Sequence, residues 1–175
     1  MEKIEQRYFF ALWPDKQTQQ YYAKFAHQYL NDCEGKFVST QNLHITLSFL
    51  GALNNKQLKT VKHIAETIKS DSFTLALDRL GYWKEPQVIW IAPSKVPSSL
   101  IEIDAALQLK FRENKINSDQ RSYKPHMTLM RKALSTPINI QLKPVEWRVK
   151  HFVLVRSTLD LKGAIYDVID KWPLK

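Results

Sequence analysis

The feature that most limits how this chain can fold is an order of elements that occurs twice along it. Each copy has the pattern of a strand, a helix and a second strand, and a His-x-Thr tripeptide lies on the second strand. The copies occupy residues 8–13, 15–31 and 43–50, and residues 88–92, 98–114 and 126–130. Their overall similarity is low, so the repeat depends on element order and on the place of the tripeptide. Strands and helices mixed in this order predict an α+β fold with helices on the outer faces of two sheets.

Further elements surround this repeat. Residues 7–13 form an aromatic run that predicts the first strand, and Pro14 and Asp15 end it and start a helix. The other predictions are a helix from Asn54 or Asn55 to residue 70, strands at 73–80 and 87–92 with a turn near Gly81, a hairpin of 149–158 and 164–169 around Lys162-Gly163, and a loop at 133–144. The 175 residues suffice for one compact domain or two tightly packed lobes.

The charge of the chain favours partners that carry many negative charges. Lys and Arg number 26 against 17 Asp and Glu, which gives a formal net charge of +9. Such a surplus favours phosphate contacts and electrostatic steering of nucleic acids. Basic residues that are spread over the surface for solubility would give the same count, so charge alone favours nucleic acid only slightly.

Cysteine usage and hydropathy indicate a cytoplasmic protein. Cys33 is the sole cysteine, so the chain can form neither an internal disulfide nor a cysteine cluster for zinc. Residues 1–7 are too charged for a signal peptide, and no apolar stretch approaches the roughly 20 residues of a membrane helix. We therefore expect a cytoplasmic location and no membrane partner.

The two His-x-Thr tripeptides carry the chemistry. Alternation along a strand places His44 and Thr46 on one face, with apolar neighbours on the other face, and it places His126 and Thr128 in the same way. Opening a cyclic phosphodiester requires one group that takes a proton from water and one that protonates the departing ribose oxygen. Two imidazoles with pKa values of about 6.5 can divide these roles near neutral pH. Threonine hydroxyls can bind the nonbridging oxygens.

A single His-x-Thr carries little weight because it arises easily by chance, and a lone strand histidine is more often a packed or surface residue. Two copies, each flanked by apolar residues in the correct phase and placed equivalently in a repeat, are much harder to attribute to chance. We therefore interpret His44 and His126 as the catalytic pair. His27, His63 and His151 lack this context and receive no role.

The motifs and their surroundings resemble the 2H phosphoesterase superfamily, and in particular its bacterial RNA 2′,3′-cyclic phosphodiesterase branch, which is also called 2′-5′ RNA ligase-like. The similarity extends from Arg7 to about Trp172. The runs that carry it are RYFFAL at 7–12, NLHITLSFLG at 42–51, VIWI at 88–91 and KPHMTLMR at 124–131.

This resemblance implies a bilobal fold in which two antiparallel sheets flank a central cleft, with a pseudo-two-fold internal repeat and one domain of two intertwined lobes over residues 1–175. It also implies hydrolysis of 2′,3′-cyclic phosphate ends of RNA to 2′-phosphomonoesters, with weak reversible 2′-5′ ligation. In that scheme His44 protonates the leaving 3′ oxygen and His126 activates water. No cofactor and no metal are expected, and a monomer is the default.

Further residues are assigned to the substrate. Thr46, Thr128 and Arg131 are predicted to bind its phosphate, although strict alternation would place Arg131 on the face opposite His126, so this role requires a bulge or a strand end. Tyr123 is the preferred candidate for stacking on a base. Core packing is the better interpretation for most of the other aromatics considered, Tyr8, Phe9, Phe10 and Phe49. Arg7, Arg148, Lys150 and Arg156 could line an RNA path or be ordinary surface charges, and Lys124 is interpreted as a solvated residue that flanks the motif.

Other functions remain open at this stage. A metal enzyme would need carboxylates or further histidines near the first pair, and neither tripeptide carries one at strand or turn spacing. A glycine-rich phosphate loop and a nucleophile elbow are both missing from the sequence. Two alternatives fit the same motifs: a phosphodiesterase for another small cyclic nucleotide, such as an ADP-ribose cyclic phosphate, and an RNA-end binding module without turnover.

Overall fold

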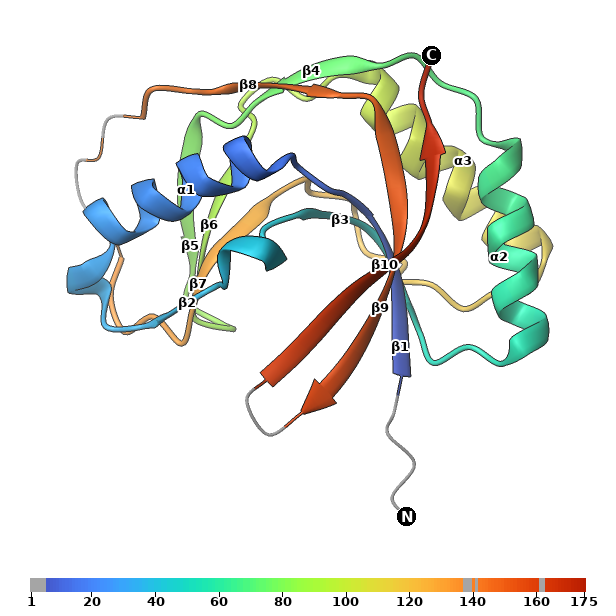
Figure 1. Ribbon diagram of the computed structural model, residues 1–175, viewed down its shortest axis with the longest axis horizontal. Coiled ribbons are helices and arrows are strands. Elements are labelled where there is room, and N and C mark those ends of the chain that lie inside the picture. Colours follow the sequence, from blue (N-terminus) through green and yellow to red (C-terminus); the bar gives the residue numbers. More distant parts are fainter. Residues whose placement is uncertain (1–5, 137–139, 141, 161–162) are drawn as a thin grey trace.

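The computed structural model describes residues 6–136, 140, 142–160 and 163–175, and it has an α+β fold built on one long antiparallel sheet (Figure 1). The order of strands in this sheet is β10-β9-β1-β3-β7-β6-β5, and β2 pairs with β7. A separate two-stranded sheet consists of β4 and β8. The strands are β1 Gln6–Leu12, β2 Lys36–Phe37, β3 Ile45–Gly51, β4 Phe73–Ala76, β5 Arg79–Trp83, β6 Val88–Ala92, β7 Met127–Arg131, β8 Glu146–Val149, β9 His151–Asp160 and β10 Gly163–Pro173.

The three longer helices begin where the sequence predicts. They are α1 Lys16–Tyr29, α2 Asn55–Thr67 and α3 Ser98–Glu113. The Asp15 carboxylate accepts a hydrogen bond from the Thr18 amide at 2.8 Å, and Asn54 forms a capping box with Gln57. Both arrangements satisfy amide groups that the first turn of a helix leaves without partners. None of the helices in the described part of the chain is long and apolar enough to cross a membrane.

The prediction of one strand over residues 73–80 is wrong. Residues 73–76 form β4, which pairs with β8, whereas β5 begins at Arg79 and pairs with β6 in the main sheet. The Asp78 carboxylate accepts hydrogen bonds from the amide and hydroxyl of Ser94, both at 2.6 Å, and this anchors the chain where it changes sheets. The alternation of apolar residues at 73, 75 and 77 stops at Asp78 and Arg79, so the sequence marks a break there but does not reveal the change of strand partner.

The predicted turn at Gly81 is also wrong, because Gly81 lies inside β5. Its cross-strand partner is Trp90, and a Cβ on Gly81 would lie 2.1 Å from the Trp90 ring. The glycine is therefore required by a close approach of a side chain rather than by a turn. The short strands β2 and β8 were not predicted, and Lys162 of the predicted hairpin turn lies outside the described residues.

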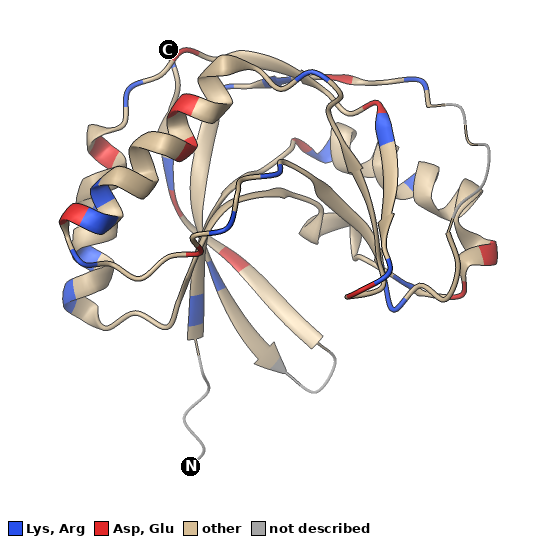
Figure 2. Ribbon diagram, turned by 180° about the vertical axis from the view of Figure 1, so that it is seen from behind, with Lys and Arg blue, Asp and Glu red and all other residues tan. Residues whose placement is uncertain are grey.

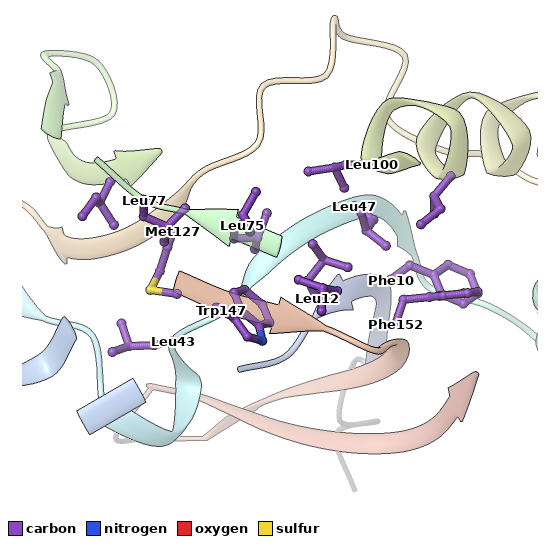
Figure 3. Close-up of a cluster of buried hydrophobic side chains, with 14 of the residues drawn as sticks. Phe10, Leu12, Leu43, Leu47, Leu75, Leu77, Leu100, Met127, Trp147 and Phe152 are labelled. Atoms are coloured by element: carbon purple, nitrogen blue, oxygen red, sulfur yellow. The ribbon is translucent and has the colours of Figure 1, made fainter. Parts of the chain in front are cut away.

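The main hydrophobic core lies on one face of the long sheet. Alternate residues of β1, Phe10 and Leu12, are fully buried there, and Leu75 and Trp147 of the β4–β8 pair cover it from the other side (Figure 3). The intervening β1 residues, Phe9 and Ala11, face the opposite side of the sheet. They form a smaller apolar cluster there with Val153, Val155, Trp13 and Tyr166.

The sheet has two halves that correspond to the two sequence copies. In the described part of the chain, β2 of the first copy pairs with β7 of the second at Lys36–Arg131 and Phe37–Met130, and β3 meets β7 at one residue pair, Ile45 with Met127. The two sheets predicted from the sequence are thus continuous at this pair. Helix α1 of the first copy contacts β7 of the second, and α3 of the second copy contacts β3 of the first. Figure 1 shows α1 on one side of this junction, with α2 and α3 on the other.

Candidate active site

The two His-x-Thr tripeptides lie side by side at the junction of the two halves. The residues that join β3 to β7, Ile45 and Met127, are the central residues of the two tripeptides. Both side chains are fully buried in the main core. Because neighbouring residues of a strand point to opposite faces, the His and Thr of each tripeptide lie on the face away from that core.

The antiparallel register defines how the four polar side chains are arranged. One step from the central pair, His44 lies across from Thr128, and Thr46 lies across from His126. All four side chains are half-buried. The two imidazoles therefore occupy diagonal corners of a square, with a threonine hydroxyl at each of the other corners. This arrangement suits a tetrahedral phosphate that must be approached from two opposite sides.

The same backbone contact orients both imidazoles. His44 Nδ1 lies 2.6 Å from the Asn42 carbonyl oxygen, and His126 Nδ1 lies 2.7 Å from that of Lys124. A carbonyl can only accept, so Nδ1 carries the proton in each ring, and Nε2 of the neutral ring is free to act as a base. His44 Nε2 lies 3.1 Å from Thr46 Oγ1.

Burial makes His44 a weak base in the unliganded protein. Its pKa is lowered from 6.5 to about 4, chiefly by burial, with smaller contributions from Arg131 and His126 and an opposing one from the Asn42 carbonyl. The pKa of His126 is also lowered, again chiefly by burial and then by Arg131. Both imidazoles are therefore mostly neutral near pH 7, and a bound anion would raise both pKa values.

An aromatic cage accounts for the burial of His44, and the sequence did not reveal it. The Trp13 ring lies parallel to the imidazole at a centroid distance of 5.1 Å and an angle of 8°. Phe9 lies at 5.1 Å and Tyr166 at 5.4 Å, the latter edge-on. Phe9 lies on β1, Trp13 directly follows that strand, and Tyr166 lies on β10 near the end of the chain. Only the folded sheet brings Tyr166 to the other two rings.

Arg131 shares a face with Thr128, because β7 contains the irregularity that this role requires. Trp90 pairs with Thr128, and Val88 pairs with Arg131. Val88 and Trp90 are two residues apart in β6 and share a face, so their partners do as well. The register shift between Ile89 and Trp90 accommodates one extra residue in β7. The prediction that Arg131 binds phosphate is thus compatible with the strand geometry.

The first copy has the same irregularity, and it brings Phe49 to the corresponding position. Phe9 pairs with Phe49 and Ala11 pairs with Thr46, with a register shift between them. Phe49 therefore lies on the same face as Thr46, as Arg131 does with Thr128. Its side chain is 51% exposed, and its ring lies 5.6 Å from that of Phe9. Phe49 thus belongs to the site face and is an exception to the core packing predicted for most of these aromatics.

Tyr123 lies beside His126, but its hydroxyl is enclosed. The residue lines a cavity of about 430 Å³ that also reaches His126. Its hydroxyl is buried and has no hydrogen-bond partner among the described residues. Burial, assisted by the Asp104 carboxylate, raises the pKa of this phenol far above its ordinary value. Tyr123 remains a neutral phenol at all relevant pH values, and its role in stacking stays a prediction.

Gln19 is a structural support for the site that the sequence did not indicate. It is a buried amide on α1, and its Nε2 donates to the carbonyls of Gln41 and Leu43 at 3.2 and 3.1 Å. These carbonyls flank Asn42, whose own carbonyl orients His44. A polar residue at a core-facing helix position was the available signal, since Tyr22 and Ala26 continue the same buried face.

We expect Gln19→Ala to lower the free energy of unfolding by about 1–3 kcal/mol, because two buried carbonyls lose their donor. It should also broaden or shift the His44 Nδ1–H signal in NMR spectra, because the segment that holds Asn42 loses its anchor. Denaturant unfolding measures the first effect. Gln20→Ala, at an exposed position next to it, is the matched control. Equal stability of the two variants would contradict the role of Gln19.

The remaining predicted basic and histidine positions lie outside this polar square. Arg156 forms an ion pair with Asp167 at 3.0 Å, and Arg148 on β8 donates to the Ser72 hydroxyl at 2.7 Å. His63 is exposed beside Glu66. Figure 2 shows Lys and Arg spread over many elements and not gathered on one. In the described part of the chain, no three His, Cys, Asp or Glu side chains cluster as metal ligands do.

The fold and the site together define a protein that pairs two His-x-Thr strands and presents both imidazoles on one face of the sheet. The chain belongs to the 2′-5′ RNA ligase superfamily, whose model matches residues 14–161. The predicted resemblance to this branch of the 2H phosphoesterases is thereby confirmed.

Individual relatives match over nearly their whole length. An Escherichia coli protein named RNA 2′,3′-cyclic phosphodiesterase is 28% identical over 97% of both chains. One of the same name from Methanocaldococcus jannaschii is 31% identical over 95% of this chain and 99% of the relative. The crystal structure of E. coli LigT in apo form superposes with a TM-score of 0.87 at 28% identity, covering 99% of each chain. The predicted α+β fold is confirmed by this match.

Proposed function

We propose that this protein hydrolyses 2′,3′-cyclic phosphates at RNA ends and leaves 2′-phosphomonoesters. The observation that carries the proposal is the diagonal placement of His44 and His126, each with Nδ1 held by a backbone carbonyl. The names of the E. coli and M. jannaschii relatives support it. E. coli LigT has also been crystallised with 3′-AMP, which supports a nucleotide ligand for this site.

In the proposed reaction, water attacks phosphorus opposite the bond to the 3′ oxygen. His126 Nε2 takes a proton from the water as the new P–O bond forms. The P–O3′ bond breaks, and the imidazolium of His44 gives its proton to the 3′ oxygen, while the bond to the 2′ oxygen stays intact. Thr46 and Thr128 bind the nonbridging oxygens, and Arg131 balances the charge that develops on them. These steps need no cofactor and no metal ion. When the 5′-hydroxyl of a second RNA takes the place of water, the same steps form a 2′-5′ phosphodiester, which accounts for weak ligation.

The anionic substrate supplies the proton state that this scheme requires. The pKa of His44 is about 4 in the unliganded protein. A phosphate beside a half-buried imidazole favours the imidazolium, because charges interact more strongly where water is excluded. Binding of the substrate therefore raises the pKa of the residue that must act as the acid.

The lowered pKa values predict that kcat/KM is highest below pH 6.5. This ratio reports the titration of the free enzyme, in which one imidazole must be neutral and the other protonated. The ratio therefore follows the amount of enzyme that carries one proton on the pair, whichever imidazole holds it. This form appears as pH rises through the titration of His44 near pH 4, and it disappears through the titration of His126, whose pKa lies below 6.5. Exchanging the acid and base roles gives the same profile. Rates with a short cyclic-phosphate oligonucleotide between pH 3.5 and 8 measure it, and an optimum above pH 7 would contradict this electrostatic account.

The function itself is tested by incubating the protein with an oligonucleotide that ends in a 2′,3′-cyclic phosphate, in buffer that contains EDTA. We expect conversion to a 2′-phosphate, identified by its resistance to a 3′-specific phosphatase and by ³¹P NMR. A 3′-phosphate product would overturn the proposed direction of attack. Salt-sensitive binding of the RNA without product would favour the binding module, and turnover of only an ADP-ribose cyclic phosphate would favour the small-nucleotide alternative.

We further propose that residues 1–175 act as one unit, because each helix of the repeat contacts the motif strand of the other copy. A monomer is sufficient for this chemistry, since one chain supplies both imidazoles. The buried Cys33 has no disulfide, which supports a reducing, cytoplasmic setting.

A further inference from the structure

A cluster of polar side chains lies on the core side of β3, and the proposed reaction does not use it. Its central residue is Gln108 of α3. The Gln108 Nε2 group donates a hydrogen bond to the Ser48 hydroxyl at 3.1 Å, and its Oε1 atom accepts one from the Ser118 hydroxyl at 2.8 Å. Both serines are buried, with exposed fractions of 3% and 8%. One amide therefore links the strand that follows His44 to the segment that leads to His126.

The register of β1 and β3 explains why a serine is buried here. Phe10 pairs with Ser48, whereas Ala11 pairs with Thr46, so Leu47 is an extra residue in β3. Cross-strand partners share a face, and Phe10 faces the main core, so Ser48 points to the core as well. Strict alternation would instead place Ser48 on the site face with Thr46. The bulge thus puts a hydroxyl among apolar side chains, where it needs a hydrogen-bond partner, and the amide on α3 supplies one.

A backbone hydrogen bond ties the same two segments together. The Asp119 amide donates to the Phe49 carbonyl at 3.1 Å, one residue beyond each of the two serines. Residues 118 and 119 are therefore both fixed against the bulge of β3. The chain then continues to Lys124, whose carbonyl oxygen lies 2.7 Å from Nδ1 of His126 and orients that ring. The path to the second imidazole thus starts at the point where the first motif strand bulges.

We propose that Gln108 is a positioning residue that holds the β3 bulge and the segment before His126 in one arrangement; its effect on the reaction rests on the proposed function. Two consequences follow from this arrangement. The bulge turns Phe49 to the site face, and the anchored segment delivers the Lys124 carbonyl to His126. Glutamine suits this place because one planar amide carries both a donor and an acceptor, and each meets a different hydroxyl.

The positioning role is tested without substrate by Gln108→Met, which keeps the length of the side chain and removes its donor and acceptor. NMR spectra report the NOE between the rings of Phe9 and Phe49, whose centroids are 5.6 Å apart, and the Nδ1–H resonance of His126. We expect the NOE to weaken and the resonance to shift or broaden. Gln28→Met, the same change at an exposed position on α1, is the control and should leave both signals as in the wild type. Wild-type signals in folded Gln108→Met would overturn the proposal.

Kinetics with an oligonucleotide that ends in a 2′,3′-cyclic phosphate measure the effect on the reaction. We expect Gln108→Met to lower kcat about 10- to 100-fold, since a displacement of about 1 Å from the reacting geometry can cost roughly 10² in rate. Ile103→Val removes one methyl group from the core beneath the same helix and is the control for stability. It should retain the wild-type kcat at a temperature where all the proteins are folded. Equal losses in the two variants would reduce Gln108 to a contributor to stability and overturn its positioning role.

The two readouts separate this inference from the proposed function. If the wild type hydrolyses no cyclic phosphate, the proposed function fails, whereas the NMR comparison still decides whether Gln108 positions Phe49 and His126. If hydrolysis is observed and Gln108→Met retains both the wild-type signals and the wild-type kcat, only the positioning role fails.

Replacing both serines by alanine supplies a second, independent test, because the proposal requires Gln108 to act through their hydroxyls. Adding Gln108→Met to the Ser48→Ala, Ser118→Ala variant should lower kcat less than twofold further, since residues of one network do not add their effects. A further loss of tenfold or more would show that Gln108 acts elsewhere and would overturn the proposal. Should Gln108→Met not fold, Ser118→Ala removes a single hydroxyl and is read by the same NMR signal of His126. An unchanged signal in that variant would contradict the role of the cluster.

Discussion

Replacing either His44 or His126 by alanine should lower kcat for a 2′,3′-cyclic phosphate by about 10²- to 10⁴-fold, since each removes one of two proton transfers. The double variant should be little worse than either single variant, because groups that act in one step lose their effect together. Single-turnover rates at the pH optimum of the wild type measure both expectations. Additive losses in the double variant, or a loss below tenfold in either single one, would sink the two-histidine mechanism.

A substrate that needs no acid distinguishes the roles of the two histidines. When sulfur replaces the leaving 3′ oxygen, the departing thiolate is stable without a proton. The His44→Ala variant should then recover most of its activity relative to the wild type, whereas His126→Ala should remain as impaired as before. The opposite pattern would exchange the acid and the base. Thermal unfolding of both variants is the control for their folded state.

Replacing Arg131 by methionine should lower kcat by about 10²- to 10³-fold, the usual loss when one stabilising group is removed from a developing anion. The shift in the β6–β7 register brings this side chain to the face of Thr128, and its charge already lowers the pKa of both imidazoles. Arg131→Met should therefore also raise the pKa values of His44 and His126, which NMR titration of the histidine ring protons measures.

Two further variants make the Arg131 result specific. Lys132→Met removes an exposed positive charge from the next residue and should leave both kcat and the histidine pKa values near those of the wild type. Arg131→Lys keeps the charge but loses the planar pair of donors, so it should recover part of the rate. If Lys132→Met and Arg131→Met reduce kcat equally, general loss of positive charge explains the effect and Arg131 has no particular role.

The sequence determined the residues that carry the chemistry and the order of the elements around them. Alternation was enough to place the His and Thr of each tripeptide on one face, because the period of a strand is local information. The caps at Asp15 and Asn54 likewise depend on neighbouring residues only. The equivalence of the two tripeptides could be read from the repeat, although the contact between Ile45 and Met127 joins residues that are far apart in the chain.

The tertiary structure decided what depends on partners distant in sequence. The register shifts turn Arg131 and Phe49 to the site face, and no local pattern announces them. The division of residues 73–80 between two sheets has the same cause, because strand pairing is not encoded by alternation. The low pKa of His44 arises from burial beneath rings that the chain supplies from both of its ends. Residue identity and periodicity are local properties, whereas strand pairing and burial exist only once the whole sheet has formed.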